Sequence, residues 1–354
     1  MGLFESVAEL PLVIETVEYS RRERETTSDF TRVSTVVSLH GDNETGRGED
    51  VTYETADHDV LQETAPTFEL AGEYTIASFS DRLAETDLFD GREPDQPAFR
   101  QYRRWAFESA ALDLALRQAE TDLASALDRT YDPVGFIVST RLGSPPSTDR
   151  LDGLLARNPA LTFKLDPTSE WTPELIETVA ETTTVRVLDL KGQYKGTDVD
   201  QEPDAELYKQ LLEAFPEAII EDPALTAETE PAFEDHRDRV SWDAPIHSVE
   251  DIDALPFAPE WLNIKPSRFG SLRSLFAAVE YCLDNGITMY GGGQFELDVG
   301  RGQLHALASL FYPHAPNDIA PGGYNLPTLP DHLPSSPLAP PTDVEGFRWP
   351  ARKS

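Results

Sequence analysis

Short apolar runs, each ending near a polar residue or glycine, recur from residue 134 onward. There are eight, from VGFIVS at 134–139 to NDIA at 317–320, and their ends lie 22 to 32 residues apart. Helical patterns separate them. This near-constant period predicts a (β/α)8 TIM-type barrel over residues 131–325. A doubly wound open sheet gives similar runs but does not need eight equal units. The eighth run is the weakest, and we include it because it completes the barrel.

The first 130 residues follow a different pattern. Residues 10–20 and 33–40 alternate between apolar and polar, which predicts a hairpin with a long mobile loop between its strands. From Gln96 to Leu127 the apolar residues follow helical spacing. We therefore predict an N-terminal α+β capping domain over residues 1–130. The proline-rich tail, residues 326–354, is expected to pack back on it as an extended segment.

The charge balance restricts the classes of partner that the protein can bind and the compartment in which we expect it. There are 64 acidic and 29 basic residues, a net charge of −35, which excludes nucleic acid and anionic membranes as partners. Apolar runs are too short for a membrane helix, and Cys282 is the single cysteine, so an intrachain disulfide is impossible. We expect a cytoplasmic, halophilic protein from a salt-rich cytoplasm. An ordinary acidic cytosolic protein is the alternative.

The predicted strand ends carry the candidate chemistry, at the edge where barrels of this kind hold their active sites. Asp189, Glu221 and Asp243 end three consecutive strands and are expected to converge. Such a cluster repels itself in a partly dry site unless a cation neutralises it. Oxygen ligands favour a hard divalent cation such as Mg²⁺. The alternative is that each acid caps the helix after its strand.

Seven segments resemble the enolase superfamily, in its mandelate racemase and muconate-lactonizing branch. GRGE resembles the glycine-rich loop of the capping domain, and ESAALDLALR the helix leading into the barrel. VLDLK, IIEDP and WDAPI lie where that family carries its three metal ligands. LNIKPSRFGSL places Lys265 at the base position, and GGGQFELDVGRGQLHALASL resembles the end of the seventh strand with its helix.

The resemblance implies a Mg²⁺-dependent enzyme acting on a small-molecule carboxylate. Lys265 would take the proton alpha to the carboxylate, giving an enediolate that the metal stabilises. A nearby dication lowers the pKa of a lysine toward the range of a useful base. Elimination or cycloisomerisation is the expected outcome, as in dehydratases, cycloisomerases and succinylbenzoate synthases. A homo-oligomer, either a dimer or an octamer, is expected as well.

The second and third strands depart from the family pattern. The usual Lys-x-Lys of the second strand reads Lys164-x-Asp166, and the usual Asp-x-Asn of the third reads Asp189-x-Lys191. Neighbouring strands in a barrel bring Asp166 and Lys191 together. We predict that the second catalytic amine has moved one strand over, with Asp166 orienting Lys191. A plain ion pair that only supports the site is the alternative.

The remaining candidate residues are assigned to the substrate. Lys164 and Arg141 are expected to hold a carboxylate oxygen, and Glu296 to bond the substrate or act as an acid. Asp318, at the end of the eighth strand, and Arg22, on the predicted loop, are also assigned to substrate binding. Two functions stay open beside elimination: a racemase or epimerase that uses Lys191 with Lys265, and a non-catalytic relative that binds a carboxylate ligand.

The charge balance also predicts a dependence on salt. Lowering the ionic strength from about 1 M to about 0.01 M lengthens the Debye length from about 3 Å to about 30 Å, so the surface carboxylates repel one another more strongly. We expect the protein to unfold over this range, as measured by far-UV circular dichroism. A protein that stays folded in dilute buffer would contradict the expectation of a salt-rich cytoplasm.

Overall fold

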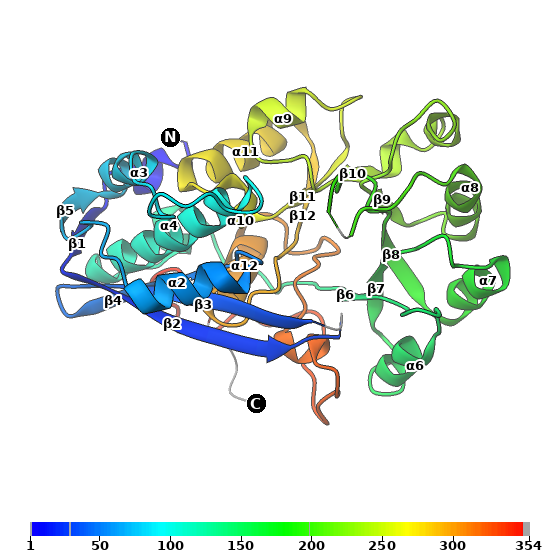
Figure 1. Ribbon diagram of the computed structural model, residues 1–354, viewed down its shortest axis with the longest axis horizontal. Coiled ribbons are helices and arrows are strands. Elements are labelled where there is room, and N and C mark those ends of the chain that lie inside the picture. The colour runs from blue at the N-terminus through cyan, green and yellow to red at the C-terminus, as the bar shows by residue number, and fades with distance from the viewer. Residues whose placement is uncertain (1, 28–29, 198, 350–354) are drawn as a thin grey trace.

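A parallel sheet forms the larger part of the fold in the computed structural model, which describes residues 2–27, 30–197 and 199–349. Seven strands pair in the order β12-β11-β10-β9-β8-β7-β6, each parallel to its neighbours. The curled sheet lies between the N-terminal domain on one side and helices α6 (Asp149–Leu155), α7 (Pro173–Thr182) and α8 (Ala205–Ala214) on the other (Figure 1). The (β/α)8 architecture predicted from the repeat is confirmed. The strands are β6 Val138–Thr140, β7 Thr162–Leu165, β8 Thr184–Asp189, β9 Ile219–Glu221, β10 Val240–Trp242, β11 Trp261–Ile264 and β12 Thr288–Gly291.

The eighth predicted run closes the sheet without forming a regular strand. Asp318 forms an isolated parallel bridge with Gly292, just after β12. On the other side, the carbonyl of Asn317 accepts a hydrogen bond of 2.9 Å from the Ile137 amide, just before β6. Proline at 316 and 321 brackets the run and removes two amide donors, which keeps it from extending as a strand.

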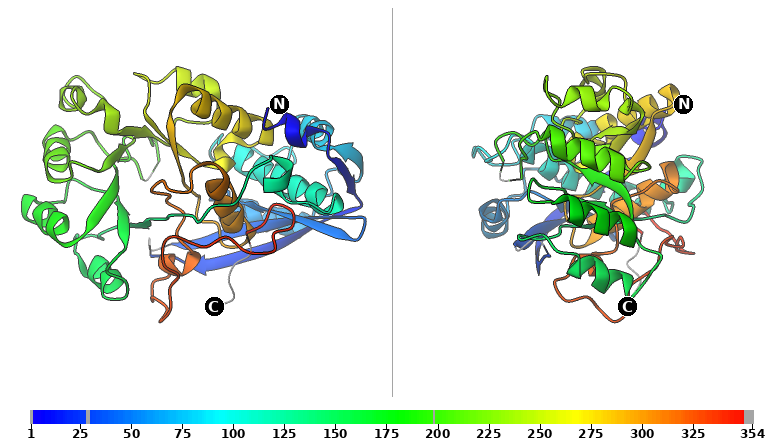
Figure 2. Two further views of the ribbon diagram at one scale, coloured as in Figure 1. Left: turned by 180° about the vertical axis from the view of Figure 1, so that it is seen from behind. Right: turned by 90° about the vertical axis from the view of Figure 1, so that its right-hand side faces the viewer.

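Helices cover the outer face of the sheet, and Figure 2 (right) shows those of the first repeats, in green, stacked in front of it. In α8 the residues Leu207, Tyr208, Leu211 and Leu212 are buried, one face of an amphipathic helix. Among the described helices, none combines the length and apolarity that crossing a bilayer requires. The helices are α6 Asp149–Leu155, α7 Pro173–Thr182, α8 Ala205–Ala214, η1 Glu230–Phe233, η2 Arg237–Arg239, α9 Val249–Asp253, α10 Pro266–Phe269, α11 Leu272–Asn285, α12 Val299–Phe311 and η3 Gly322–Asn325.

The N-terminal domain packs a long helix, α4 (Phe99–Gln118), against an antiparallel sheet of β2, β3 and β4. A Cβ at Gly46 would lie 2.1 Å from the Ala110 carbonyl oxygen, and one at Gly48 2.0 Å from that of Ala106. The glycines of the GRGE segment therefore let β4 approach the helix backbone closely. The other elements are α1 Glu5–Ala8, β1 Pro11–Ile14, β2 Thr16–Glu25, β3 Thr31–Gly41, β4 Glu44–Asp50, α2 Thr55–Thr64, β5 Gly72–Thr75, α3 Ile76–Ala84 and α5 Leu123–Ala126.

The hairpin of β2 and β3 is longer than its apolar pattern indicates. Residues 21–25 pair in register with residues 31–35, so the expected long loop between them is wrong. Residues 21–25 are all charged and none of them is fully buried, so alternation of apolar residues could not show that this part of β2 is paired. Beyond these paired residues, the Thr27 amide donates to the Asn325 carbonyl at 3.2 Å, and the Phe30 ring packs edge-on against Phe295.

Glu49 joins β4 to the start of α12. Its buried carboxylate accepts hydrogen bonds from the amides of Leu297 (2.6 Å), Asp298 (3.0 Å) and Gly300 (2.9 Å), and from the Ser34 hydroxyl (2.6 Å). Burial raises the pKa of the Glu49 carboxyl, and these donors oppose that rise. The Glu49 carboxylate of the N-terminal domain thus holds the segment that carries Glu296.

The C-terminal tail contacts both parts of the chain. The buried carboxylate of Asp113, on α4, accepts hydrogen bonds from the Phe347 amide at 2.9 Å and from Nε of Arg348 at 2.5 Å. Leu338 bridges to Val134, just before the first barrel strand. The tail is an extended segment, held by polar contacts at both of these points.

Replacing Glu49 with Ala leaves three backbone amides without their acceptor. We expect the free energy of unfolding to fall by about 3 kcal/mol, measured by urea denaturation. Glu73→Ala, at an exposed position of β5, is the matched control and is expected to change stability by less than about 0.5 kcal/mol. Equal stabilities of the two variants would contradict the role of Glu49.

Candidate active site

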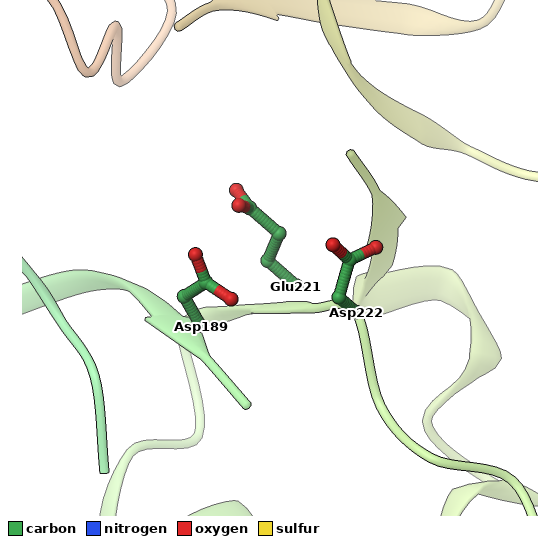
Figure 3. A group of neighbouring side chains, drawn as sticks. All are labelled: Asp189, Glu221 and Asp222. Carbon is green, nitrogen blue, oxygen red and sulfur yellow. The ribbon is translucent and has the colours of Figure 1, made fainter. Parts of the chain in front are cut away.

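Three carboxylates meet where β8 and β9 end. Asp189, Glu221 and Asp222 each offer an oxygen atom, and these atoms lie within 4.8 Å of one another. Figure 3 shows the three carboxylates gathered on the same side of the strands that carry them. All three residues are fully buried, so water does not screen their mutual repulsion. The structure must supply positive charge to hold them together.

Glu221 lies at the centre of the group. Its Oε1 accepts from Nζ of Lys164 at 2.5 Å, and its Oε2 from the amide of Asn263 at 3.1 Å and from the Tyr290 hydroxyl. Burial, followed by the charge of Asp189, raises the pKa of the Glu221 carboxyl well above its usual range, although Lys164 opposes the rise. The surrounding donors therefore compensate the negative charge only in part.

Asp189 holds two ammonium groups on one oxygen. Its Oδ2 lies 2.9 Å from Nζ of Lys164 and also contacts Nζ of Lys191. Burial acts to raise the pKa of this carboxyl, but the two lysines outweigh it, and the pKa lies below its usual range. Nζ of Lys164 is also 3.5 Å from Oδ2 of Asp318, so the end of the eighth run reaches the same lysine.

Asp222 connects the ends of β9 and β10. Its backbone adopts a left-handed conformation, with φ of 50°, and its two oxygens accept from the amides of Asp243 and Ala244, each at 2.9 Å. Burial and the charges of Asp243 and Asp189 raise the pKa of its carboxyl to about 7. Both oxygens are thus fixed by backbone donors.

Asp243 is held by cationic side chains. Its Oδ2 accepts from Nζ of Lys265 and from the Tyr194 hydroxyl, both at 2.7 Å, and its Oδ1 lies 3.2 Å from Nε of Arg268. Burial acts to raise the pKa of this carboxyl, but Arg268 and Lys265 hold it below its usual range. Asp243 lies outside the group of three acids described above, and its role as a metal ligand stays a prediction.

Lys265, the predicted base, is buried at the end of β11. A Cβ at Gly292 would lie 2.7 Å from its Cε, so the missing side chain at Gly292 leaves room for the lysine stem. A Cβ at the next position, Gly293, would lie 2.3 Å from Oε2 of Glu296. The glycines after β12 therefore let Lys265 and Glu296 lie close to the backbone there.

Lys191 and Asp166 lie near each other, as the neighbouring strands predict. Nζ of Lys191 is 3.9 Å from Oδ2 of Asp166, and that oxygen accepts from Nε of Arg141 at 3.0 Å. Lys191 has a φ of 54°. The loop after β8 is joined to the loop after β9 by a hydrogen bond of 2.9 Å from the Gly192 amide to the Asp222 carbonyl. Arg141, assigned to the substrate from sequence, contacts Asp166.

Two predicted residues contact other protein groups. Glu296 is buried, accepts from the Gln294 amide at 2.7 Å, and lies 3.3 Å from a terminal nitrogen of Arg301. Arg22 pairs with Asp298 at 2.5 Å, next to α12. Their assigned contacts with a substrate stay predictions.

Sequence reasoning left several groups of the site unassigned. Asn263 lies two positions before Lys265 on the same strand face, and Tyr290 points inward from β12, so the period of two was a usable signal for both. Arg268 follows Lys265 by three residues, on the next helical turn. Asp222 and Tyr194 lie after strand ends, where backbone conformation decides direction and no periodicity applies.

The donor set fits a hard divalent cation. The three clustered groups are all carboxylates, and the pKa of Glu221 and that of Asp222 are raised by burial and by neighbouring negative charge. Carboxylate oxygens at this spacing are ligands that Mg²⁺ accepts.

Lys164→Met removes the ammonium group that pairs with both Asp189 and Glu221. We expect the free energy of unfolding in EDTA to fall by about 3 kcal/mol, measured by urea denaturation, because two buried carboxylates lose their partner. Added Mg²⁺ is expected to restore part of this loss. Lys209→Met, at an exposed position of α8, is the control, and a Lys164 variant as stable as this control would contradict the assigned role.

Comparison with known proteins places this geometry in a family. Residues 5–126 and 130–326 match the N-terminal and the C-terminal domain of a family described as a domain of unknown function, DUF8230. A curated relative, the o-succinylbenzoate synthase of Bacillus subtilis, is 27% identical over 230 residues, which cover 60% of this chain and 57% of that protein. The match thus spans little more than half the length of that relative.

Solved structures share the fold over most of the chain. A member of the enolase superfamily from Listeria innocua superposes with a TM-score of 0.68 at 19% identity, covering 90% of this chain and 88% of its own. Muconate cycloisomerase from Pseudomonas fluorescens gives 0.66 at 17% identity, covering 90% of each chain. A dipeptide epimerase from Methylococcus capsulatus, complexed with Mg, gives 0.65 at 20% identity, covering 90% and 92%. The chain therefore belongs to the DUF8230 family, and its fold is that of the enolase superfamily.

Proposed function

We propose that the protein is a Mg²⁺-dependent lyase or isomerase that removes the proton alpha to the carboxylate of a small molecule. Elimination or cycloisomerisation then completes the reaction. One observation carries the proposal: buried carboxylates at the ends of β8, β9 and β10 lie beside lysines from the ends of β7, β8 and β11. The likeness to a muconate cycloisomerase and to an o-succinylbenzoate synthase supports the same class of reaction.

Asp189 and Glu221 would hold the cation, with Asp243 as the third ligand. Asp243 suits this role better than Asp222, because both oxygens of Asp222 already accept backbone amides, whereas Oδ1 of Asp243 is buried and accepts no hydrogen bond among the described residues. When bound, the cation stabilises the negative charge that develops on the substrate carboxylate.

Lys265 would accept the alpha proton. It is buried at a strand end, and Asp243 accepts its Nζ at 2.7 Å, so the ammonium formed after proton transfer has a counter-ion in place. Lys164, between Asp189 and Glu221, brings positive charge to the side where a substrate carboxylate would lie. The chain's own groups thus supply both a proton acceptor and charge for an anionic substrate.

Epimerisation is the second candidate, and the position of Lys191 favours it. This residue provides a further amine at the end of β8, beside Asp189. A base on each face of a substrate carbon would invert it, and a dipeptide epimerase is among the proteins with this fold.

Exchange of the alpha proton in D2O tests the proposal. Acid sugars, dipeptides and cyclic carboxylic acids are incubated with the protein and MgCl2, and deuterium uptake is followed by mass spectrometry. We expect uptake with at least one class, and a loss of at least about 10³-fold in Lys265→Met, because general base catalysis is removed. Lys209→Met is expected to retain the wild-type rate.

The products separate the two reactions. A new unsaturated or cyclic product identifies elimination or cycloisomerisation, and an inverted centre without net loss of substrate identifies an epimerase. A wild-type protein that binds Mg²⁺ and each class of acid without any exchange would overturn the proposal in favour of a carboxylate-binding protein.

A further inference from the structure

We propose that Lys191 is an internal counter-ion that leaves Asp189 when a divalent cation binds and takes Asp166 as its partner. This inference rests on the metal site of the proposed function. It assigns Asp166 and Arg141 to positioning a mobile amine and not to direct contact with a substrate.

The first observation is the crowding on one oxygen of Asp189. Oδ2 contacts Nζ of Lys191 and lies 2.9 Å from Nζ of Lys164, in a fully buried setting. Two ammonium groups on one oxygen compensate part of the negative charge of the acid cluster. A divalent cation bound by Asp189 would repel both ammonium groups strongly at such distances, so at least one of them must give way.

Lys191 is the less firmly held of the two. Nζ of Lys164 also contacts Glu221 at 2.5 Å and Asp318 at 3.5 Å, and its side chain is 2% exposed. The Lys191 side chain is 13% exposed. Of the three clustered acids, Lys191 pairs only with Asp189 among the described residues. Displacing Lys191 therefore breaks fewer ion pairs than displacing Lys164.

A receiving carboxylate is already in reach. Oδ2 of Asp166 is 3.9 Å from Nζ of Lys191, and Oδ1 of Asp166 is buried with no hydrogen-bond partner among the described residues. A buried oxygen without a donor is costly, and an ammonium group that arrives there supplies one. Arg141 holds the other oxygen at 3.0 Å, which fixes Asp166 for this contact.

The surrounding backbone allows the side chain to move alone. The Gly192 amide and the side-chain amide of Gln193 bond to the carbonyls of Asp222 and Pro223, at 2.9 Å and 2.6 Å, so the loop stays anchored. Nζ of Lys191 lies 4.9 Å from the centre of the Tyr194 ring, a contact that favours a cation. The lysine thus exchanges one carboxylate for another while its Cα stays in place.

Titration of metal affinity tests this exchange without a substrate. Mg²⁺ binding is measured by calorimetry for the wild type, Lys191→Met, Asp166→Asn and the double variant. Lys191→Met removes the competing ammonium, so we expect tighter binding by roughly tenfold. Asp166→Asn removes the alternative partner, so we expect weaker binding by roughly threefold to tenfold in the wild-type background and no change in the Lys191→Met background.

The dependence of the Asp166→Asn effect on the residue at 191 distinguishes a lysine that changes partners from a purely electrostatic effect of Asp166 on the metal site. If the charge of Asp166 acted only through space, Asp166→Asn would weaken binding equally in both backgrounds, and that result would overturn the proposal. An unchanged or weaker affinity in Lys191→Met would overturn it too. Lys209→Met controls for net charge, and Lys191→Gln repeats the test should the Met variant unfold.

Failure of this inference is distinct from failure of the proposed function. A wild-type protein that binds Mg²⁺ but shows no coupling between Lys191 and Asp166 contradicts only the exchange. A wild-type protein and a Lys191→Met variant that both bind no divalent cation at millimolar concentration contradict the metal site itself, and the exchange with it.

Discussion

The arrangement of the site depends on one electrostatic constraint: the negative charge of carboxylates that are buried side by side must be neutralised. Asp189 and Glu221 are shielded from water, so cations from the protein or from solution must balance them. Lys164 does this from β7, and Lys191 from the loop after β8. The positions of the lysines follow from this constraint, because no other described side chains bring positive charge to Asp189.

The N-terminal domain contributes to the site by fixing the segments around it. Glu49 binds three amides at the start of α12, and the close approach of β4 to α4 brings this carboxylate to the joint. The ribbon of β2 and β3 pairs through Arg22 with Asp298 at the same place. These polar contacts therefore link strands of one domain to the start of α12 in the other.

Periodicity was enough to predict the barrel and the acids at its strand ends, because a parallel strand places its last residue at a fixed edge. It predicted that Asp166 and Lys191 would be neighbours for the same reason. It could not show that Arg141 is the nearer partner of Asp166, or that Lys191 rests on Asp189, because side chains choose among several charges within reach. The length of the β2–β3 ribbon was also missed, since residues 21–25 of β2 are all charged and show no apolar alternation although their backbone is paired.

Two of the residues after the strand ends, Lys191 and Asp222, have φ of 54° and 50°. A residue other than glycine costs about 1 kcal/mol in this conformation, so glycine at either position would relax the chain. That change would also cost stability, because glycine at 222 leaves the amides of Asp243 and Ala244 without acceptors, and glycine at 191 takes an ammonium group from Asp189. The backbone strain at these two residues is therefore offset by what their own side chains bind.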